Sequence, residues 1–135
     1  MSNTRNQSCE ERVADNLHSR MEDLRRLWAA YCAGNESDDE RLHEYGLSFD
    51  YVPPETFDGQ REAYFRYQLS WGGPSDEFRF FVNPDLSLHR TEYWFLDWFD
   101  GAHRVLSGED EALLRDLWEW FRECGAAEHA IKEAA

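Results

Sequence analysis

The hydrophobic pattern near the start of the chain has the three- and four-residue spacing of an amphipathic helix. The apolar stripe consists of Val13, Leu17, Met21, Leu24, Leu27, Trp28 and Tyr31. This spacing predicts a helix over 10–33 with one buried face, and Gly34 is suited to end it. Ser37 and Glu40 then form a capping-box pattern, which predicts a short acidic helix over 38–45.

Residues 47–99 change to the two-residue alternation of β-strands, interrupted by turn residues. The alternation predicts four strands, at 47–52, 63–71, 77–82 and 88–99. Pro53 and Pro54 end the first strand, because proline cannot donate to a sheet. The segments GGPSD and NPDLS have the composition of turns. Since the links are short, we expect an antiparallel meander.

A second long helix is predicted after the strands. Ser107 precedes an acidic turn, as helix N-caps often do, and helical spacing continues to about Cys124. The order of elements favours an α+β fold, with both long helices on one face of a four-stranded sheet. We expect one domain over 1–135, with fraying at 1–8 and 126–135. The expected core is Leu24, Leu27, Trp28, Phe65, Phe80, Phe95, Leu114, Leu117 and Phe121.

The segment YWFLDWFDG, residues 93–101, places five aromatic residues and two aspartates within nine positions. Strand alternation would divide it into two sets: Trp94, Leu96 and Trp98 on one face, and Tyr93, Phe95, Asp97 and Phe99 on the other. An unpaired carboxylate is costly in a packed core, so we expect the face of Asp97 to be open and the tryptophans to be deeper. The alternative is that the open set packs against the 53–63 loop.

The formal net charge of −14 at pH 7 is the largest anomaly of the composition. Most of it comes from two blocks, 35–62 and 93–135. Such a charge repels nucleic acid, anionic membranes and phosphorylated ligands. We therefore expect a basic protein as partner, bound by a monomer or a homodimer. The alternative is that the charge serves only solubility.

Motifs of common enzymes are missing from the sequence: it contains no phosphate-binding loop, no nucleophile elbow and no zinc-protease signature. Cys9, Cys32 and Cys124 lack the spacing of a disulfide framework or a zinc site. No apolar run has the length of a membrane span or a secretory signal. These features predict a cytoplasmic protein without a cofactor.

Two chemical alternatives stay open. His89 and His103 with Asp97 or Asp100 would supply a general acid and base if the chain brought them together. Asp50 with Asp97 and Asp100 would supply carboxylate oxygens for Mg²⁺ or Ca²⁺. A small enzyme built on the His/Asp set is the third function considered, after the two binding functions below.

Two segments, EYGLSFDYVPPETFDGQREAYFRYQLSWGGPSDEFRFF and EYWFLDWFDGA, resemble a group of short acidic proteins of unknown function carried by bacterial plasmids and integrating elements. The resemblance covers roughly Tyr45 to Ala102. It implies a mobile-element context, in which small acidic proteins block CRISPR or restriction systems, often as DNA mimics. It carries over no site residue.

We therefore expect a non-enzymatic inhibitor, of anti-CRISPR or anti-restriction type, that binds a basic nucleic-acid-handling protein. The alternative is an immunity protein or antitoxin that neutralises a nuclease toxin by the same physics. The expected partner-binding residues are Glu36, Asp38, Asp39, Glu40, Glu44, Asp50, Tyr93, Asp97, Phe99, Asp100, Glu109, Asp110 and Glu119.

Overall fold

The structure, a computed structural model, describes residues 8–135 as helices on one side of a single sheet. In chain order the elements are α1 (Cys9–Ala33), the 3₁₀ turn η1 (Leu42–Glu44), β1 (Ser48–Val52), β2 (Tyr64–Ser70), β3 (Ser75–Val82), β4 (Leu88–Asp97), β5 (Asp100–Val105), α2 (Gly108–Glu123) and α3 (Ala126–Ala134). The strands form an antiparallel meander in the order β1-β2-β3-β4-β5. The α+β class is therefore confirmed, with five strands in place of four.

Helix α1 is capped at both ends, by Ser8 at its start and by Gly34 at its end. The Ser8 hydroxyl accepts the Glu11 N–H, and the Glu11 carboxylate accepts the Ser8 N–H, which completes a capping box. At the other end Gly34 has a φ of 72°, a conformation that glycine adopts without strain. The helix predicted over 10–33 therefore begins only one residue earlier in the structure.

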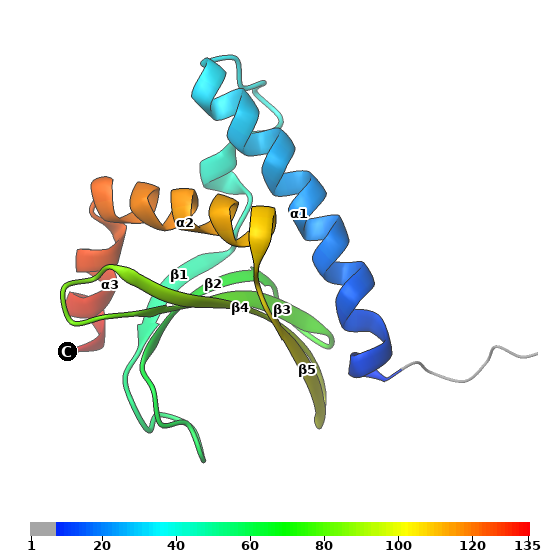
Figure 1. Ribbon diagram of the computed structural model, residues 1–135, viewed down its shortest axis with the longest axis vertical. Helices are drawn as coiled ribbons and strands as arrows, with labels where there is room; N and C mark the ends of the chain where they lie inside the picture. Colours follow the sequence, from blue (N-terminus) through cyan, green and yellow to red (C-terminus); the bar gives the residue numbers. More distant parts are fainter. Residues whose placement is uncertain (1–7) are drawn as a thin grey trace, which may run out of the picture.

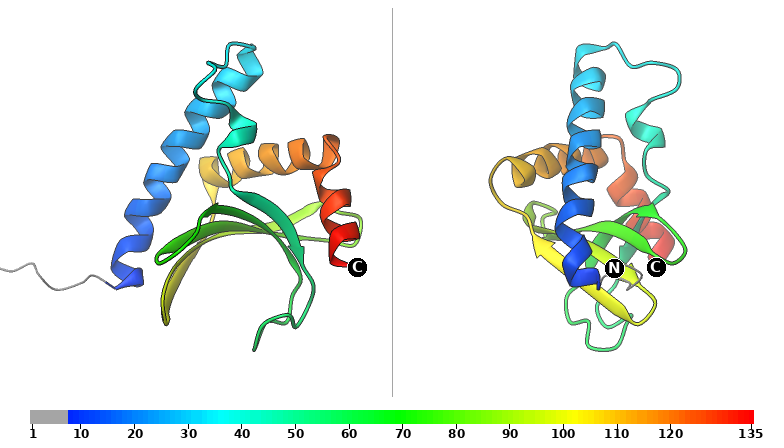
Figure 2. Two further views of the ribbon diagram at one scale, coloured as in Figure 1. Left: turned by 180° about the vertical axis from the view of Figure 1, so that it is seen from behind. Right: turned by 90° about the vertical axis from the view of Figure 1, so that its right-hand side faces the viewer.

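The sheet is arched, and the helices cover its convex face. Figures 1 and 2 show α1 and α2 on this face, α3 beside the edge strand β1, and the concave face left open. At the centre of the core the Trp118 ring of α2 meets Phe65 and Phe80 of the sheet, with ring centroids 4.9 Å and 5.4 Å away. The expectation that both long helices share one face is confirmed.

The core is the part of the fold that the hydrophobic pattern predicted best. Every residue of the predicted core is buried except Trp28, which is half-buried and packs against the cluster. Each buried CH₂ group contributes about 0.8 kcal/mol to stability. The apolar stripe of α2 is therefore the main feature that stabilises this helix against the sheet. The helix-facing side of β2, β3 and β4 supplies the other half of this core.

The C-terminal part of the sheet differs from the prediction. Strand β4 ends at Asp97, Trp98 and Phe99 form a two-residue turn, and β5 returns with Asp100 opposite Asp97. The predicted strand over 88–99 ran through this turn because tryptophan and phenylalanine are typical strand residues. The favoured two-residue turns usually carry glycine or asparagine instead.

The short helix predicted over 38–45 is reduced to η1. The bond that suggested it is present, since the Glu40 N–H donates to the Ser37 hydroxyl at 3.1 Å. The Glu36 carboxylate, however, accepts the Leu42 N–H at 2.8 Å, across six residues. This longer connection closes the segment as a loop and leaves only one 3₁₀ turn after it.

The C-terminal segment, where we expected fraying over 126–135, forms a packed helix in the structure. Helix α3 lies against β1 and buries Ala127 and Ala130. Because it covers an edge strand, it also shields backbone groups that would otherwise be open to another chain. The fraying expected at 1–8 falls, apart from Ser8, outside the described residues.

A buried carboxylate of β3 joins α1 to the sheet. The Asp76 side chain is 4% exposed, and its two oxygens accept hydrogen bonds from the Arg20 guanidinium at 2.7 Å and 2.8 Å. The Tyr93 hydroxyl donates to Asp76 at 2.6 Å, and the Ser70 hydroxyl donates to its other oxygen. A buried ion pair is tolerated when further hydrogen bonds satisfy it, and this one is satisfied from three sides.

We expect this network to make stability depend on acid pH. Burial alone would raise the pKa of Asp76, but the hydrogen bonds from Arg20, Ser70 and Tyr93 outweigh it and hold the pKa below its ordinary value of 3.8. A lowered folded-state pKa stabilises the fold above the unfolded pKa, and this stabilisation is lost as the pH falls through the folded pKa. Urea unfolding of wild-type protein and Asp76→Asn should therefore differ fully at pH 7 and progressively less below pH ~3.8. An equal difference at pH 7 and at pH ~2.5 would contradict this assignment.

Candidate functional site

Three large aromatic side chains stand exposed at one end of the sheet. Trp71 of the β2–β3 hairpin is 79% exposed, and Trp98 and Phe99 of the β4–β5 turn are 86% and fully exposed. The two hairpin ends are neighbours, since a Cβ placed on Gly73 would lie 3.5 Å from the Trp98 indole nitrogen. We refer to Trp71, Trp98 and Phe99 as the hairpin-tip surface.

The turn that presents Trp98 is strained. Trp98 has a φ of 57°, and a two-residue turn with positive φ at its first central residue favours glycine. For a bulky side chain the left-handed region costs about 1–2 kcal/mol. The side chain recovers little of this cost within the chain, because it is 86% exposed. Exposed aromatic groups of this kind mark interaction surfaces, and tryptophan is enriched among the residues that dominate binding energy.

The faces of β4 are the reverse of those expected. Tyr93 is fully buried with its hydroxyl on Asp76, and Phe95 lies in the core, whereas Trp94 faces the open side of the sheet. The carboxylate of Asp97 does not need an open face, because it lies at the end of the strand, where Arg12 of α1 pairs with it at 3.0 Å. Phe99 remains a candidate for partner contact, and Tyr93 does not.

Acidic groups flank the hairpin-tip surface and fix it to α1. Asp100, directly after Phe99, accepts the Cys9 N–H at 2.7 Å, so the first turn of α1 is held against the β4–β5 turn. This backbone hydrogen bond also keeps the pKa of Asp100 below its ordinary value. Asp97 lies on the other side of the turn, and Glu10 of α1 pairs with Arg104 of β5 at 2.7 Å. The exposed rings therefore project from a rigid base with carboxylates beside them.

Apart from Asp97 and Asp100, the predicted acidic residues lie on other parts of the surface. Six of the thirteen predicted residues are carboxylates paired with arginines: Asp38 with Arg41, Glu40 with Arg26, Asp50 with Arg66, Asp97 with Arg12, Asp110 with Arg25, and Glu119 with Arg122. Glu36 accepts the Leu42 N–H, Glu44 lies 3.7 Å from His43, and Asp39 and Glu109 are exposed.

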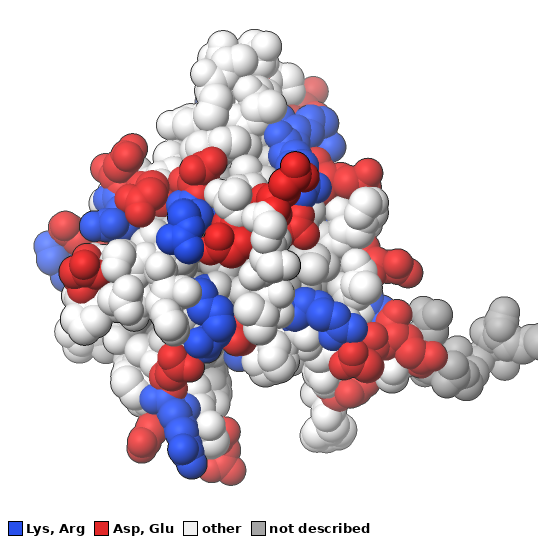
Figure 3. Space-filling model, viewed as in Figure 1, with Lys and Arg blue, Asp and Glu red and all other residues white. Residues whose placement is uncertain are grey.

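The two acidic blocks approach each other at α1, where Arg25 contacts Asp110 of one block and Arg26 contacts Glu40 of the other. Arginines thus separate the blocks at this point. On the face shown in Figure 3, positive and negative residues alternate over the helices. This alternation does not favour the uninterrupted row of carboxylates that simple DNA mimicry requires.

The structure does not assemble either of the alternative chemical sites. His103 lies on the open face of β5 opposite Trp94, whereas Asp97 lies on the helix side with Arg12. His89 is five residues from Trp94 along β4, or roughly 16 Å at the rise of a strand. Within residues 8–135 no group of three His, Cys, Asp or Glu side chains is placed to hold a metal ion.

Asp50, the third residue of the proposed cation site, lies on β1 and pairs with Arg66 of β2, and three strands lie between β1 and β5. The carboxylates that were grouped by residue type are therefore separated by the width of the sheet.

The exposure of Trp71 and the residues that line the open face of the sheet were not predicted from the sequence. Trp71 directly precedes Gly72, whose φ of 113° belongs to a tight hairpin turn. A tryptophan directly before such a turn lies beyond the part of the strand that the helices cover. The turn residues of the segment WGGP therefore already indicated that Trp71 is exposed. The lining of the open face was not predicted because Trp94 was assigned to the buried set and β5, which carries His103, was not recognised as a strand.

Similarity to known proteins adds no assignment to this geometry. Helices able to cross a bilayer are not found among residues 8–135. No protein-family model matches the chain, and no curated protein and no solved structure is significantly similar to it.

Proposed function

We propose that the protein acts by binding a basic, nucleic-acid-handling protein as an inhibitor, and that the hairpin-tip surface is its main contact. The single observation that supports this most directly is Trp98, an almost fully exposed indole on a strained turn. Folding alone gains nothing from this arrangement. A partner that buries the indole gains apolar area at about 25 cal/mol per Å².

Two features of the surface suit such a partner. Trp98, Phe99 and Trp71 offer large, stiff rings that lose little conformational entropy on binding. Asp97, which pairs with Arg12, and Asp100 sit beside the rings, and the charge of Asp100, which no arginine among residues 8–135 neutralises, complements lysine or arginine on the opposing surface. The contact is therefore an aromatic centre with an acidic rim.

The charge of the whole chain supports the kind of partner. A net charge of −14 attracts a basic surface over a long range and raises the rate of encounter. Proteins that bind nucleic acids carry such basic surfaces, because they neutralise phosphates with lysine and arginine. Covering this surface would block access of the nucleic acid. The proposal rests on the hairpin tips and on this attraction, and not on a copy of the spacing of DNA charges.

The test uses Trp98→Gly, which removes the indole and relieves the strained backbone together. Wild-type and variant protein are immobilised and exposed to a bacterial extract at about 0.1 M salt. We expect wild-type protein to retain a basic nucleic-acid-binding protein, and the variant to bind it roughly 30-fold more weakly, as for a residue worth ~2 kcal/mol. The Tm of the variant should be unchanged or higher, so that lost binding cannot be attributed to unfolding.

Phe57→Ala is the matched control, because Phe57 is a half-exposed aromatic residue at the other end of the sheet. It should retain the partner. Raising the salt to about 0.5 M should weaken retention by wild-type protein, since screening shortens the range of charge interactions. Retention of the same protein by Trp98→Gly, or retention of acidic proteins only, would contradict the proposal.

A further inference from the structure

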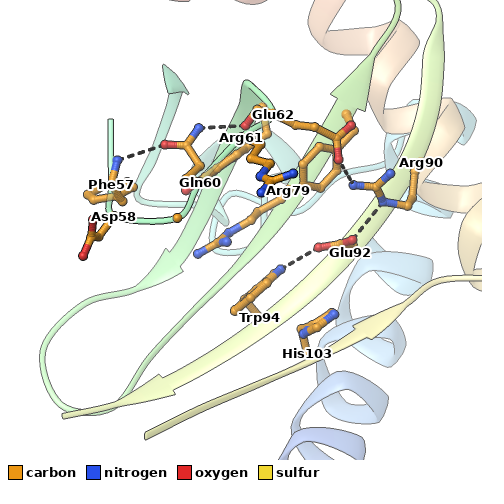
Figure 4. A pocket seen from close by; sticks show the side chains of 13 residues that line it. Phe57, Asp58, Gln60, Arg61, Glu62, Arg79, Arg90, Glu92, Trp94 and His103 are labelled. Atoms are coloured by element: carbon orange, nitrogen blue, oxygen red, sulfur yellow. Dashed lines mark hydrogen bonds and ion pairs between the residues drawn. The ribbon is translucent and has the colours of Figure 1, made fainter. Parts of the chain in front are cut away.

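The concave face of the sheet holds a pocket of about 540 Å³ on the side away from the helices. Its floor comes from β2, β3, β4 and β5, and the 53–63 loop forms one wall (Figure 4). Its volume lies in the usual range of small-molecule sites, about 300–1,000 Å³. None of the residues of the hairpin-tip surface lines it.

The floor of the pocket is a row of stacked planar groups, one from each strand. His103 of β5 stacks on Trp94 of β4 with ring centroids 4.4 Å apart and planes 9° apart. The Arg79 guanidinium of β3 lies 3.9 Å from the Trp94 ring and 4.6 Å from the Tyr64 ring of β2. Open sheet faces usually carry small polar residues. This one carries a rigid surface of rings and guanidinium groups.

The loop wall is held in place by a single amide. The Gln60 side-chain oxygen accepts the N–H groups of Thr56 and Phe57, and its nitrogen donates to the carbonyls of Pro53 and Glu62. All four hydrogen-bonding positions of the amide are used. Phe57 and the neighbouring residues therefore lie in a preorganised loop, which lowers the entropic cost of binding a ligand.

The pocket has hydrogen-bond donors without partners, whereas most of its carboxylate acceptors are already paired. Arg90 already binds Glu62 and Glu92, and the Trp94 indole also donates to Glu92. Arg79 uses only Nε, on Glu77, so its two Nη groups make no hydrogen bond within residues 8–135. Glu62, Glu77 and Glu92 therefore already pair with arginines and are not free to accept hydrogen bonds from the same groups of a ligand.

Arg61 is the clearest unused group. It lines the pocket, and none of the acids among residues 8–135 pairs with it, in a chain where most arginines have carboxylate partners. Asp58, the remaining acid of the lining, is exposed on the loop. The unused polar capacity of the pocket is therefore mainly that of guanidinium groups.

We propose that this pocket binds a small aromatic carboxylate. The carboxylate would pair with Arg61 and with the unused Nη groups of Arg79, because guanidinium and carboxylate match in a two-bonded geometry. The ring would lie against Phe57 and His103, which are both open to the pocket. Rings stack favourably on imidazole, benzene and guanidinium planes.

The net charge sets a limit on the ligand. A protein with a net charge of −14 repels polyanions, so we do not expect a nucleic-acid strand to bind this face. A single carboxylate meets far less repulsion, and at about 0.1 M salt charges more than ~10 Å away are largely screened. The inference goes beyond the proposed function and does not depend on it, because the hairpin tips lie outside the pocket.

The experiment measures binding of 2-naphthoate to the full chain by calorimetry and by saturation-transfer NMR. Two probes separate the parts of the ligand: 2-naphthylmethanol has the ring without the charge, and acetate has the charge without the ring. We expect 2-naphthoate to bind with a Kd of about 1 mM or lower, and each partial probe to bind at least about tenfold more weakly. Adenosine monophosphate tests whether a phosphate on a ring is accepted in place of a carboxylate.

Arg61→Gln should weaken 2-naphthoate binding by about tenfold, the usual loss for a charge-assisted pair. Because Arg61 is exposed and has no ion-pair partner among the described residues, the Tm of the Arg61→Gln variant should equal that of the wild type. Arg104→Gln is the matched control: Arg104 follows His103 on β5 but contacts Glu10, outside the pocket, and binding should be unchanged.

Three outcomes would overturn the proposal. The first is no binding of 2-naphthoate up to about 10 mM. The second is equal binding by the wild type and Arg61→Gln. The third is stronger binding of adenosine monophosphate than of 2-naphthoate, which would assign the pocket to phosphate-bearing ligands instead.

Discussion

Replacing Asp76 by alanine is expected to lower the free energy of unfolding by about 3–5 kcal/mol, the usual cost of removing one partner of a buried ion pair. The loss leaves the Arg20 guanidinium without its carboxylate and the buried Tyr93 hydroxyl without an acceptor. Each unsatisfied buried group costs about 1–3 kcal/mol. Chemical unfolding followed by far-UV circular dichroism measures the change.

Glu40→Gln is the control for this experiment. It removes a carboxylate that pairs with Arg26 at 2.8 Å, but both side chains are about half-exposed. Exposed pairs contribute about 0–1 kcal/mol, so the variant should stay close to wild type. If Asp76→Ala lost no more stability than Glu40→Gln, the network between α1 and β3 would not stabilise the fold.

Leu117→Ala is expected to lower the free energy of unfolding by about 2–5 kcal/mol. Leu117 is fully buried on the face of α2 that packs on the sheet. The Trp118 ring beside it is surrounded by aromatic residues of the sheet and has little freedom to fill the cavity. The cost should therefore include both the lost transfer free energy and the cavity.

The same substitution at an exposed leucine gives the comparison. Leu47 is 61% exposed, and Leu47→Ala should change stability by no more than about 0.5 kcal/mol. A Tm of Leu117→Ala as high as that of Leu47→Ala would show that α2 does not pack on the sheet as described.

Long periodic segments made most of the fold predictable from sequence. The apolar stripe of α1 and the stripe around Leu117 each run over several helical turns, and burial of one face decides both. The capping box of Ser8 was not needed for this prediction, but it explains why α1 starts at Cys9. Periodicity therefore located the helices and nearly the whole core.

The turn at Trp98 and Phe99 could not be predicted, because local propensity and tertiary structure disagree there. Both residues favour strands, and only the pairing of Asp97 with Asp100 shows that the chain reverses. The error also affected the site: because the predicted strand continued to residue 99, β5 was not predicted at all. Tyr93 was then assigned to the open side, although its burial depends on a hydroxyl acceptor, Asp76, from another strand.

Candidate binding residues were predicted from charge, and charge alone does not distinguish a paired carboxylate from a free one. Six of the predicted acids contact arginines, and four of these arginines lie far away in the sequence, as in Asp97 with Arg12 and Asp110 with Arg25. The exposed rings of Trp71 and Trp98 depend on the geometry of turns, and the stacked pocket depends on strand register. Neither property can be obtained from residue spacing.

The most direct test of the hairpin-tip surface is a photo-crosslinking measurement. Phe99 is replaced by p-benzoylphenylalanine, and Phe57 carries the same replacement in a second protein. Both are irradiated in a bacterial extract, and the crosslinked proteins are identified by mass spectrometry. A basic nucleic-acid-binding protein crosslinked at position 99 and not at position 57 is the predicted result. Crosslinks to such a protein at position 57 alone, or to none from position 99 while a complex still forms, would contradict the proposed contact.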